Sequence, residues 1–296
     1  MLQHGIEGIR AHLATLPNMR DQTVEEAREM YDKAKYVFAL PEGVETAQHE
    51  IGGVPAEVVT PPARGAGTFL YLHGGGYAIG SPVSHRHLVA ALAVASRTRA
   101  VALDYRLAPE NPFPAALDDA LAGYRGLLDA GTAPGSIVIG GDSAGGGLTV
   151  ATLLAIRDAG LPLPAAAVCI SPWADLTNEA ESYRTHAERD PLVFQEDIDR
   201  WGGAYLAGAD PRTPLASPLH ADLSGLPPLL IQVGSEEVLL DDSRLLAQRC
   251  KAAGGDATLE VWDDMIHVWH WFGEYLDEAA KAVDRIGEFV RDRLTG

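Results

Sequence analysis

A serine stands between two glycines in the stretch GDSAG, residues 141–145, directly after the apolar run SIVIG at residues 136–140. A G-x-S-x-G turn between a strand and a helix exposes the serine hydroxyl, because the flanking glycines let the neighbouring backbone pass close. The N-terminus of a helix that begins after Ser143 also favours negative charge developing beside it. Ser143 is therefore the candidate nucleophile, and a glycine-rich turn that only packs a helix is the structural alternative.

A serine hydroxyl becomes a good nucleophile only when a general base, usually histidine, takes its proton. His267 and His270 both follow the last strand-like run, in the stretch WDDMIHVWHWF. His267 lies in the loop, whereas His270 lies about one turn into the next helical pattern, so His267 is the candidate base. The H-x-x-H spacing beside Asp263 and Asp264 is also compatible with a metal site, but no third convergent ligand is evident. We expect no metal.

An acid that orients the base is expected after the apolar run PPLLIQVG, residues 227–234, where the chain continues with four acids: Glu236, Glu237, Asp241 and Asp242. The acids nearest the strand end can reach the catalytic face, and the two aspartates lie at least one helical turn further on. We favour Glu237, with Glu236 and Asp241 still open. A charge at a helix N-terminus is the alternative role, above all for the two aspartates.

A histidine and three glycines, HGGG at residues 73–76, end another apolar run. Three consecutive glycines weaken any helix or strand, so their place at a strand end indicates that something must approach the backbone closely. Attack of a serine on a carbonyl creates an oxyanion that needs fixed N–H donors, and we expect them from Gly75, Gly76 and Ala144. The dinucleotide spacing G-x-G-x-x-G is absent from this loop, and we expect no cofactor.

Apolar runs alternate with helical patterns after residue 67. The expected strands are 67–73, 99–105, 136–142, 165–171, 227–234 and 257–262, and the expected helices lie near 83–97, 113–130, 144–160, 239–253 and 268–294. Several runs are continuously apolar, which is typical of a parallel sheet covered by helices on both faces. Two more short strands flank Gly52-Gly53, a hairpin signal. The sequence predicts a single α/β domain over 1–296, with a mostly parallel sheet of about eight strands.

Two segments interrupt this alternation. Residues 1–40 carry two helical patterns, and residues 172–226 separate two strands by far more than the usual connection of about 4–6 residues. We expect both segments to pack together as a helical cap over one end of the sheet, and ordinary surface decoration is the alternative. The bulky side chains expected to line a substrate pocket beneath this cap are Phe38, Tyr77, Trp201 and Tyr205.

Bulk properties exclude several classes of partner. The net charge of -18 and the pI of about 4.8 argue against nucleic acid and against stable association with an anionic membrane. The N-terminus lacks an apolar signal core, and no window of 18 apolar residues occurs. Cys169 and Cys250 are expected to be buried free thiols, which fits a reducing cytoplasm. The sequence is compatible with a homodimer but does not predict the oligomeric state.

The combination of HGGG and GDSAG resembles the bacterial hormone-sensitive-lipase-like esterases, a branch of the α/β-hydrolase superfamily. Similar stretches are DYRLAPENPFPAALDD at 104–119, SPWADLT at 171–177, DPL at 190–192 and IHVW at 266–269. The resemblance runs from about residue 40 to the end. It implies an α/β-hydrolase fold and a cofactor-free carboxylesterase under a helical cap. The family acid usually stands in a D-P-L-x-D pattern, and the matching stretch 237–241 places a glutamate there.

The leading hypothesis is a serine carboxylesterase that acts on a small-molecule ester through an acyl-enzyme. A lactone hydrolase or a deacetylase of a small metabolite is the alternative within the same chemistry, and a non-catalytic small-molecule receptor is a different class. A lipase acting on lipid aggregates would need a large exposed apolar lid face. If the cap closes the acyl pocket, activity should peak with acyl chains of about four to eight carbons. For longer chains, steric crowding against the cap should outweigh the free energy gained by burying each further methylene.

Overall fold

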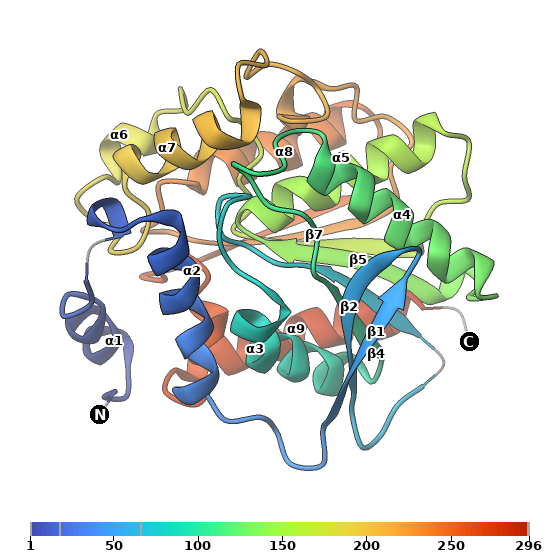
Figure 1. The fold of residues 1–296 in the computed structure, drawn as a ribbon, viewed down its shortest axis with the longest axis horizontal. Helices are drawn as coiled ribbons and strands as arrows, with labels where there is room; N and C mark the ends of the chain where they lie inside the picture. Colours follow the sequence, from blue (N-terminus) through green and yellow to red (C-terminus); the bar gives the residue numbers. More distant parts are fainter. Residues whose placement is uncertain (1, 18, 66, 295–296) are drawn as a thin grey trace.

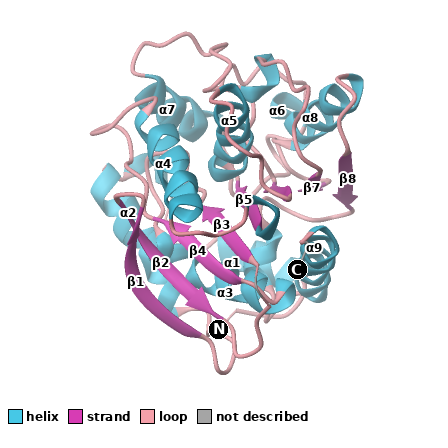
Figure 2. Ribbon diagram, turned by 90° about the vertical axis from the view of Figure 1, so that its right-hand side faces the viewer, coloured by secondary structure: helices cyan, strands magenta, loops and turns pink. Residues whose placement is uncertain are grey.

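An eight-stranded sheet runs through the centre of the protein (Figures 1 and 2), in a computed structural model that describes residues 2–17, 19–65 and 67–294. The strand order across the sheet is β1-β2-β4-β3-β5-β6-β7-β8. The strands are β1 Glu45–Ile51, β2 Val54–Thr60, β3 Thr68–Leu72, β4 Arg99–Leu103, β5 Ile137–Asp142, β6 Ala166–Ile170, β7 Leu229–Gly234 and β8 Ala257–Trp262. The expected strands are therefore confirmed, with ends that differ by one or two residues.

The directions of the strands explain where the chemistry gathers. β1 pairs with β2 and β2 with β4 in antiparallel fashion, whereas every pair from β4 to β8 is parallel. In the register between β3 and β5, Leu72 lies opposite Gly141, so the HGGG loop and the Ser143 turn leave the sheet at the same edge. The carboxyl ends of parallel strands are where open α/β sheets bind their ligands.

Two helical layers cover the sheet (Figure 1). On one face α3 Pro82–Ser96 packs against α9 Asp277–Arg293, and the opposite face carries α4 Ala115–Asp129, α5 Ala144–Asp158 and α8 Leu240–Ala252. The sequence predicted one final helix over 268–294, and this is wrong at its start. The chain forms a short 3-10 turn, η5 Trp269–Phe272, and begins α9 only at residue 277. The chain between η5 and α9 includes Leu276, whose extended backbone, with φ −142° and ψ 114°, interrupts the helical conformation directly before α9.

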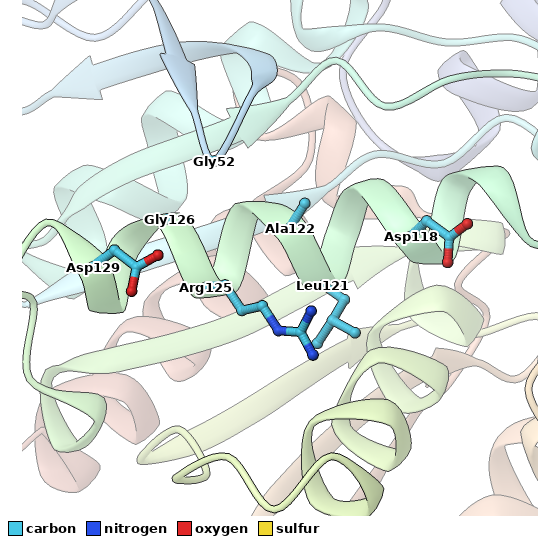
Figure 3. Close-up of a pocket in the computed structure, with 7 residues that line it drawn as sticks. All are labelled: Gly52, Asp118, Leu121, Ala122, Arg125, Gly126 and Asp129. Carbon is cyan, nitrogen blue, oxygen red and sulfur yellow. The ribbon is translucent and has the colours of Figure 1, made fainter.

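The β1–β2 hairpin turn rests on α4 (Figure 3). Gly52 has φ +61°, and a side chain on it would overlap the backbone oxygen of Ala122. Glycine is needed here both for the turn and for the close approach. A cavity of about 380 Å³ lies beside this contact, lined also by Asp118, Leu121, Arg125, Gly126 and Asp129. Its lining contains no serine, cysteine or histidine, so we do not assign catalysis to it.

The N-terminal segment and the long insertion contain the remaining helices. The N-terminal elements are α1 Ile6–Leu13, η1 Met19–Asp21, α2 Val24–Asp32 and η2 Lys33–Tyr36, and the insertion holds α6 Ser182–Thr185, α7 Gln195–Leu206 and η4 Pro218–His220. The two segments contact each other, since Arg20 pairs with Glu196 at 2.6 Å and Arg10 donates to the carbonyl of Arg189 at 2.9 Å. In Figure 1 the N-terminal segment lies below α7, and η1 is the N-terminal element that packs against α7.

Helix α2 is also fastened to the loops at the sheet edge. It begins with a capping box between Thr23 and Glu26, which satisfies backbone donors of the first turn. Arg28 then donates to the carbonyl oxygens of Ala78 and Ala108 at 2.8 and 2.9 Å and makes a bidentate ion pair with Glu110. These contacts fix α2 against the chain that continues from the HGGG loop.

Candidate active site

Ser143 lies at the tip of the turn between β5 and α5. Its backbone has φ +53° and ψ −122°, a conformation that non-glycine residues rarely adopt. The turn is fixed because Ser143 N–H donates to Ile170 O at 2.8 Å and Ser143 O accepts from Trp173 N–H at 2.9 Å. A side chain at Gly145 would overlap backbone oxygens of the neighbouring strand end, which explains the small residue there. The local geometry is that of a nucleophile elbow.

Glu237 and His267 form a buried pair beside this turn. His267 Nδ1 lies 2.8 Å from Glu237 Oε2, and Glu237 is 0% exposed. The other carboxylate oxygen accepts from Ser171 Oγ at 2.7 Å and from the amide of Gly234 at 2.6 Å. The carboxylate is thus fully engaged, and it orients the imidazole with Nε2 available as a base.

The other acids considered from the sequence point elsewhere. Glu236 faces Arg189 at 3.7 Å, and Asp241 accepts from the Ser182 amide at 3.0 Å. Asp242 accepts from the amides that follow Trp173, at 2.9 and 3.0 Å. Of the four acids after β7, the structure brings Glu237 to the histidine.

The protonation of His267 reflects two opposing effects. Burial lowers the pKa of His267, but the hydrogen bond and charge of Glu237, with the charges of Asp190 and Asp142, outweigh it and raise the pKa above its ordinary value. His270 bonds instead to Gln232 Oε1 at 2.8 Å, and burial lowers its pKa to about 3. The two histidines of the H-x-x-H spacing therefore bond to different partners. Among the described residues, no group of three or more histidine, cysteine, aspartate or glutamate side chains could hold a metal ion.

Free backbone donors surround the serine. Gly75 and Gly76 have φ +114° and +59°, and Ala144 is the first residue of α5, whose first-turn amides have no partner within the helix. In the described chain no protein acceptor receives the N–H of Gly75, Gly76 or Ala144. Donors of this kind are what an oxyanion requires.

The glycine loop is held in place by side chains behind it. Asp142 accepts from the Gly74 amide at 3.0 Å, the Tyr71 hydroxyl at 2.6 Å and His85 Nε2 at 3.3 Å. Burial acts to raise the pKa of Asp142, but its charge and hydrogen-bond interactions hold it at about 2. Asp142 therefore stays ionised and fixes the loop that carries the free amides.

A cavity of about 1220 Å³ joins these groups to the N-terminal segment and the insertion. Its lining includes Gly75, Gly76, Ser143 and His267, together with residues of 2–38 and 187–201. Within the described chain, no hydrogen bond joins the Ser143 hydroxyl to the His267 ring, and such contacts often tighten only when substrate is bound. Ser143, His267 and the two glycines Gly75 and Gly76 thus border one space that is large enough for a substantial ligand.

Comparison with known proteins decides the family. A family model described as alpha/beta hydrolase fold matches residues 69–271. A crystal structure described as an esterase from the bacterial hormone-sensitive lipase family is 49% identical, with a TM-score of 0.93, covering 98% of this chain and 97% of that one. The chain belongs to this family of alpha/beta hydrolases. It is an esterase, a carboxylic ester hydrolase.

Further relatives point to the same activity class. The esterase is 53% identical to an acetyl-hydrolase of Streptomyces hygroscopicus over 92% of this chain and 91% of the relative. It is 33% identical to an esterase of Acinetobacter venetianus over 89% and 87% of the two chains. The crystal structure of EstE5 soaked with p-nitrophenyl butyrate superposes with a TM-score of 0.94 at 46% identity, over 98% and 99% of the chains.

The structure places the four expected substrate-lining residues in two groups. Phe38 and Trp201 line the cavity of the esterase, whereas Tyr77 and Tyr205 are not among its lining residues. The rings of Tyr77 and Tyr205 stack on each other, with centroids 3.8 Å apart, in the core beside α5. Both side chains are buried there.

Asp190 is a residue whose part in the site the sequence argument missed. It lies in the insertion, is buried, and accepts from the amides of Leu192, Val193 and Val238 at 3.0–3.1 Å. Burial raises the pKa of Asp190 to about 6. The charge of His267 acts to lower this pKa, and the charge of Glu237 acts to raise it. Asp190 therefore ties the insertion to Val238, the residue that follows Glu237. The DPL stretch was its available signal.

Among the residues that the structure describes, none of the helices has both the length and the apolar character needed to span a bilayer.

Proposed function

We propose that the esterase hydrolyses short- to medium-chain acyl esters through a covalent acyl-enzyme on Ser143. The observation that carries this proposal is the 2.8 Å hydrogen bond between His267 Nδ1 and buried Glu237, on the cavity that Ser143 also lines. With Nδ1 donating to the carboxylate, Nε2 is the nitrogen that takes the serine proton.

The first half-reaction forms the acyl-enzyme. The Ser143 oxygen bonds to the ester carbonyl carbon while its proton passes to His267 Nε2, and the oxyanion is met by the amides of Gly75, Gly76 and Ala144. Collapse breaks the bond to the alcohol oxygen, which leaves with the proton held by His267. The buried negative charge of Glu237 stabilises the imidazolium between these steps.

The second half-reaction repeats the chemistry with water. A water molecule attacks the acyl carbon and gives a proton to His267, and the carboxylic acid leaves as the proton returns to the Ser143 oxygen. We further propose that residues 1–40 and 172–226 act as the cap that sets acyl length, supported by the positions of Phe38 and Trp201 on the cavity.

Removal of an acetyl group from a larger alcohol is the second candidate function. It is supported by the name of the acetyl-hydrolase at 53% identity and by a cavity, of about 1220 Å³, that far exceeds the space an acetyl group needs. In that case the remaining space would hold the alcohol.

A substrate profile tests both candidates. p-Nitrophenyl esters from acetate to decanoate should give a maximum at about four to eight acyl carbons if the cap limits acyl length. A preference for acetate that persists across bulky alcohols would favour the deacetylase. Ser143→Ala should lower kcat by on the order of 10⁶ with an unchanged circular dichroism spectrum. A variant retaining more than about a tenth of the activity would remove Ser143 from the mechanism.

We also place the esterase in the reducing cytoplasm. Cys169 and Cys250 are both buried and free, and burial raises the pKa of the Cys169 thiol to about 12. Fractionation of the producing cells, with activity followed in each fraction, tests this placement. Activity confined to the culture medium would contradict it.

A further inference from the structure

A buried carboxylate without partners lies on the cavity, away from the catalytic residues. Asp197, in the first turn of α7, is 4% exposed and lines the same cavity as Ser143. Within the described part of the chain, neither of its carboxylate oxygens accepts a hydrogen bond. A buried charge of this kind is costly unless a donor pairs with it.

A helix N-terminus alone does not account for Asp197. Acids are common in a first turn because they complement the helix dipole, and Glu196 in the same turn does so from an exposed position. The side chain of Asp197 bonds to none of the first-turn amides. Neither the helix dipole nor a capping hydrogen bond therefore explains why Asp197 is buried beside the cavity.

The nearby arginines are engaged with other groups. Arg20 pairs with Glu196 at 2.6 Å, and the Arg200 guanidinium lies 4.3 Å from the Trp201 ring centroid and donates to Met19 O at 3.5 Å. Burial raises the pKa of Asp197, Arg20 and Arg200 act to lower it, and Glu196 and Asp21 act to raise it. The cations thus moderate the local charge without bonding the carboxylate.

A second buried acceptor faces the same space. Gln22 follows η1, which packs against α7, and its Oε1 is buried without a donor among the described residues. The other ionisable residues that line the cavity outside the catalytic pair are mostly acidic: Asp21, Glu26, Glu29, Glu188, Asp190 and Asp142, with His12, Tyr31 and Lys33. Asp142 and Asp190 lie at the catalytic end, so the acceptors between η1 and α7 are the oxygens of Asp197 and Gln22, and Asp21 of η1 adds negative charge there.

We propose that the part of the cavity between η1 and α7 is a subsite for a primary ammonium group carried by the ester substrate, with Asp197 as its main acceptor. The inference rests on the proposed ester hydrolysis at Ser143. A primary ammonium carries three donors, which suits the two oxygens of Asp197 and the amide oxygen of Gln22. Charge-assisted hydrogen bonds of this type are the strong ones in a desolvated site.

The position of Trp201 indicates how far Asp197 lies from the oxyanion loop. Trp201 packs on Gly76 of the oxyanion loop, and Asp197 lies four residues earlier in α7, about 6 Å toward the N-terminus of the helix. The ammonium must therefore be separated from the reacting carbonyl by a flexible spacer of several bonds. Either the acyl or the alcohol part of the ester could carry it.

Matched pairs of esters test the subsite. The acyl arm compares p-nitrophenyl 6-aminohexanoate with the heptanoate, and the alcohol arm compares 6-aminohexyl acetate with heptyl acetate, at pH 7.5. We expect kcat/KM for the amine to exceed that of its neutral partner by about tenfold or more in one arm. Asp197→Asn should bring this ratio close to one, whereas Asp199→Asn, an exposed acid of the same helix that bonds to Gln195 and does not line the cavity, should keep it.

A separate readout checks that Asp197 is an unpaired charge. Because its pKa is raised on folding, its protonation favours the folded state and its stability contribution worsens as pH rises. Asp197→Asn should therefore raise the thermal midpoint of the ligand-free protein, and more at pH 7 than near the ordinary aspartate pKa of 3.8, where the unfolded chain is still partly protonated.

The outcomes separate this inference from the proposed function. If neutral esters are hydrolysed but neither arm prefers the amine, or if Asp197→Asn leaves the ratio unchanged, the ammonium subsite is refuted and the esterase mechanism stands. If no ester is hydrolysed in a Ser143-dependent way, the proposed function fails first. A lower thermal midpoint of Asp197→Asn would show that the carboxylate is already paired within the protein, which also overturns the subsite.

Discussion

The buried carboxylates at the two ends of the large cavity differ in how many hydrogen bonds the protein gives them. At the catalytic end Glu237 accepts from Ser171, Gly234 and His267, all within 2.6–2.8 Å. At the other end Asp197 is nearly as buried, yet neither oxygen has a partner within the described residues. The first arrangement is fixed before substrate arrives, whereas the second is completed only by an added donor.

This difference separates two uses of polar groups. A charge that orients a catalytic base is useful only when its own position is fixed, so its remaining lone pairs are satisfied by the protein. A charge that recognises a ligand must stay unsatisfied in the free protein, at some cost in stability. Substitutions at the two ends should accordingly differ in kind: in rate at the first, and in selectivity at the second.

The largest effect is expected at the triad acid. Glu237→Gln keeps the shape but removes the charge that orients His267, and kcat should fall by about 10⁴, as expected when a triad acid becomes an amide. Asp241→Asn is the matched control, because Asp241 bonds to Ser182 and Arg244 and should cost little. Steady-state kinetics on p-nitrophenyl butyrate compare the two. If the Asp241 variant is the inactive one, the assignment of Glu237 is wrong.

A smaller effect is expected at the oxyanion loop. Gly76→Ala places a methyl group about 2.8 Å from Trp201 Cβ at a backbone φ of +59°, so the amide must shift. Loss of one donor should lower kcat by about 10²–10³ with a smaller change in KM. Gly203→Ala, in α7 with open space around it, is the control. A raised KM with unchanged kcat would show that the loop only shapes the ground-state pocket.

The pH profile should respond to Asp190. Neutral His267 is the active base, so kcat/KM falls as the pH drops below the raised pKa of His267. Asp190→Asn removes a charge that raises this pKa, so the acid limb should move to lower pH. The rate should also fall roughly tenfold, because the hydrogen bond between Asp190 and the Val238 amide is disturbed. Asp222→Asn, exposed and bonded to Ser224, should leave the profile unchanged. An acid limb that does not move would exclude coupling between Asp190 and the base.

The smallest effect concerns acyl length. Phe38→Ala enlarges the cavity at the N-terminal segment, and each further methylene that becomes buried gains about 0.8 kcal/mol, roughly fourfold in kcat/KM. The optimum should move to longer chains in the p-nitrophenyl ester series. Tyr36→Ala, 80% exposed, serves as the control and should not move it. An unchanged optimum in the Phe38 variant would exclude this wall as the limit on acyl length.

The sequence was most informative where chemistry depends on chain order. Ser143, Glu237 and His267 each follow a strand of a parallel sheet, so their convergence at one edge followed from the strand pattern. The stacking of Tyr77 on Tyr205 could not be predicted, because a contact between residues far apart in the chain leaves no periodic signal.

The unpartnered groups were beyond the reach of sequence. Asp197 has the pattern of an ordinary acid in a first turn, and only the tertiary structure reveals that its oxygens are buried on a cavity. Asp190 likewise bonds to Val238 across 48 positions of the chain. The break before α9 was missed since the apolar pattern from 268 onward continues through it.

Arg28 has a wider consequence for how such an enzyme can change over evolutionary time. Its guanidinium joins the substrate wall on α2 to Ala78 and Ala108, in the chain that continues from the oxyanion loop. A mutation that reshapes this wall is therefore transmitted mechanically to the machinery that sets the rate. The insertion has comparable links, since Trp201 packs on Gly76 and Asp190 bonds to the amide of Val238 beside Glu237. Selectivity and turnover in this esterase should therefore change together, whichever of the two segments mutates.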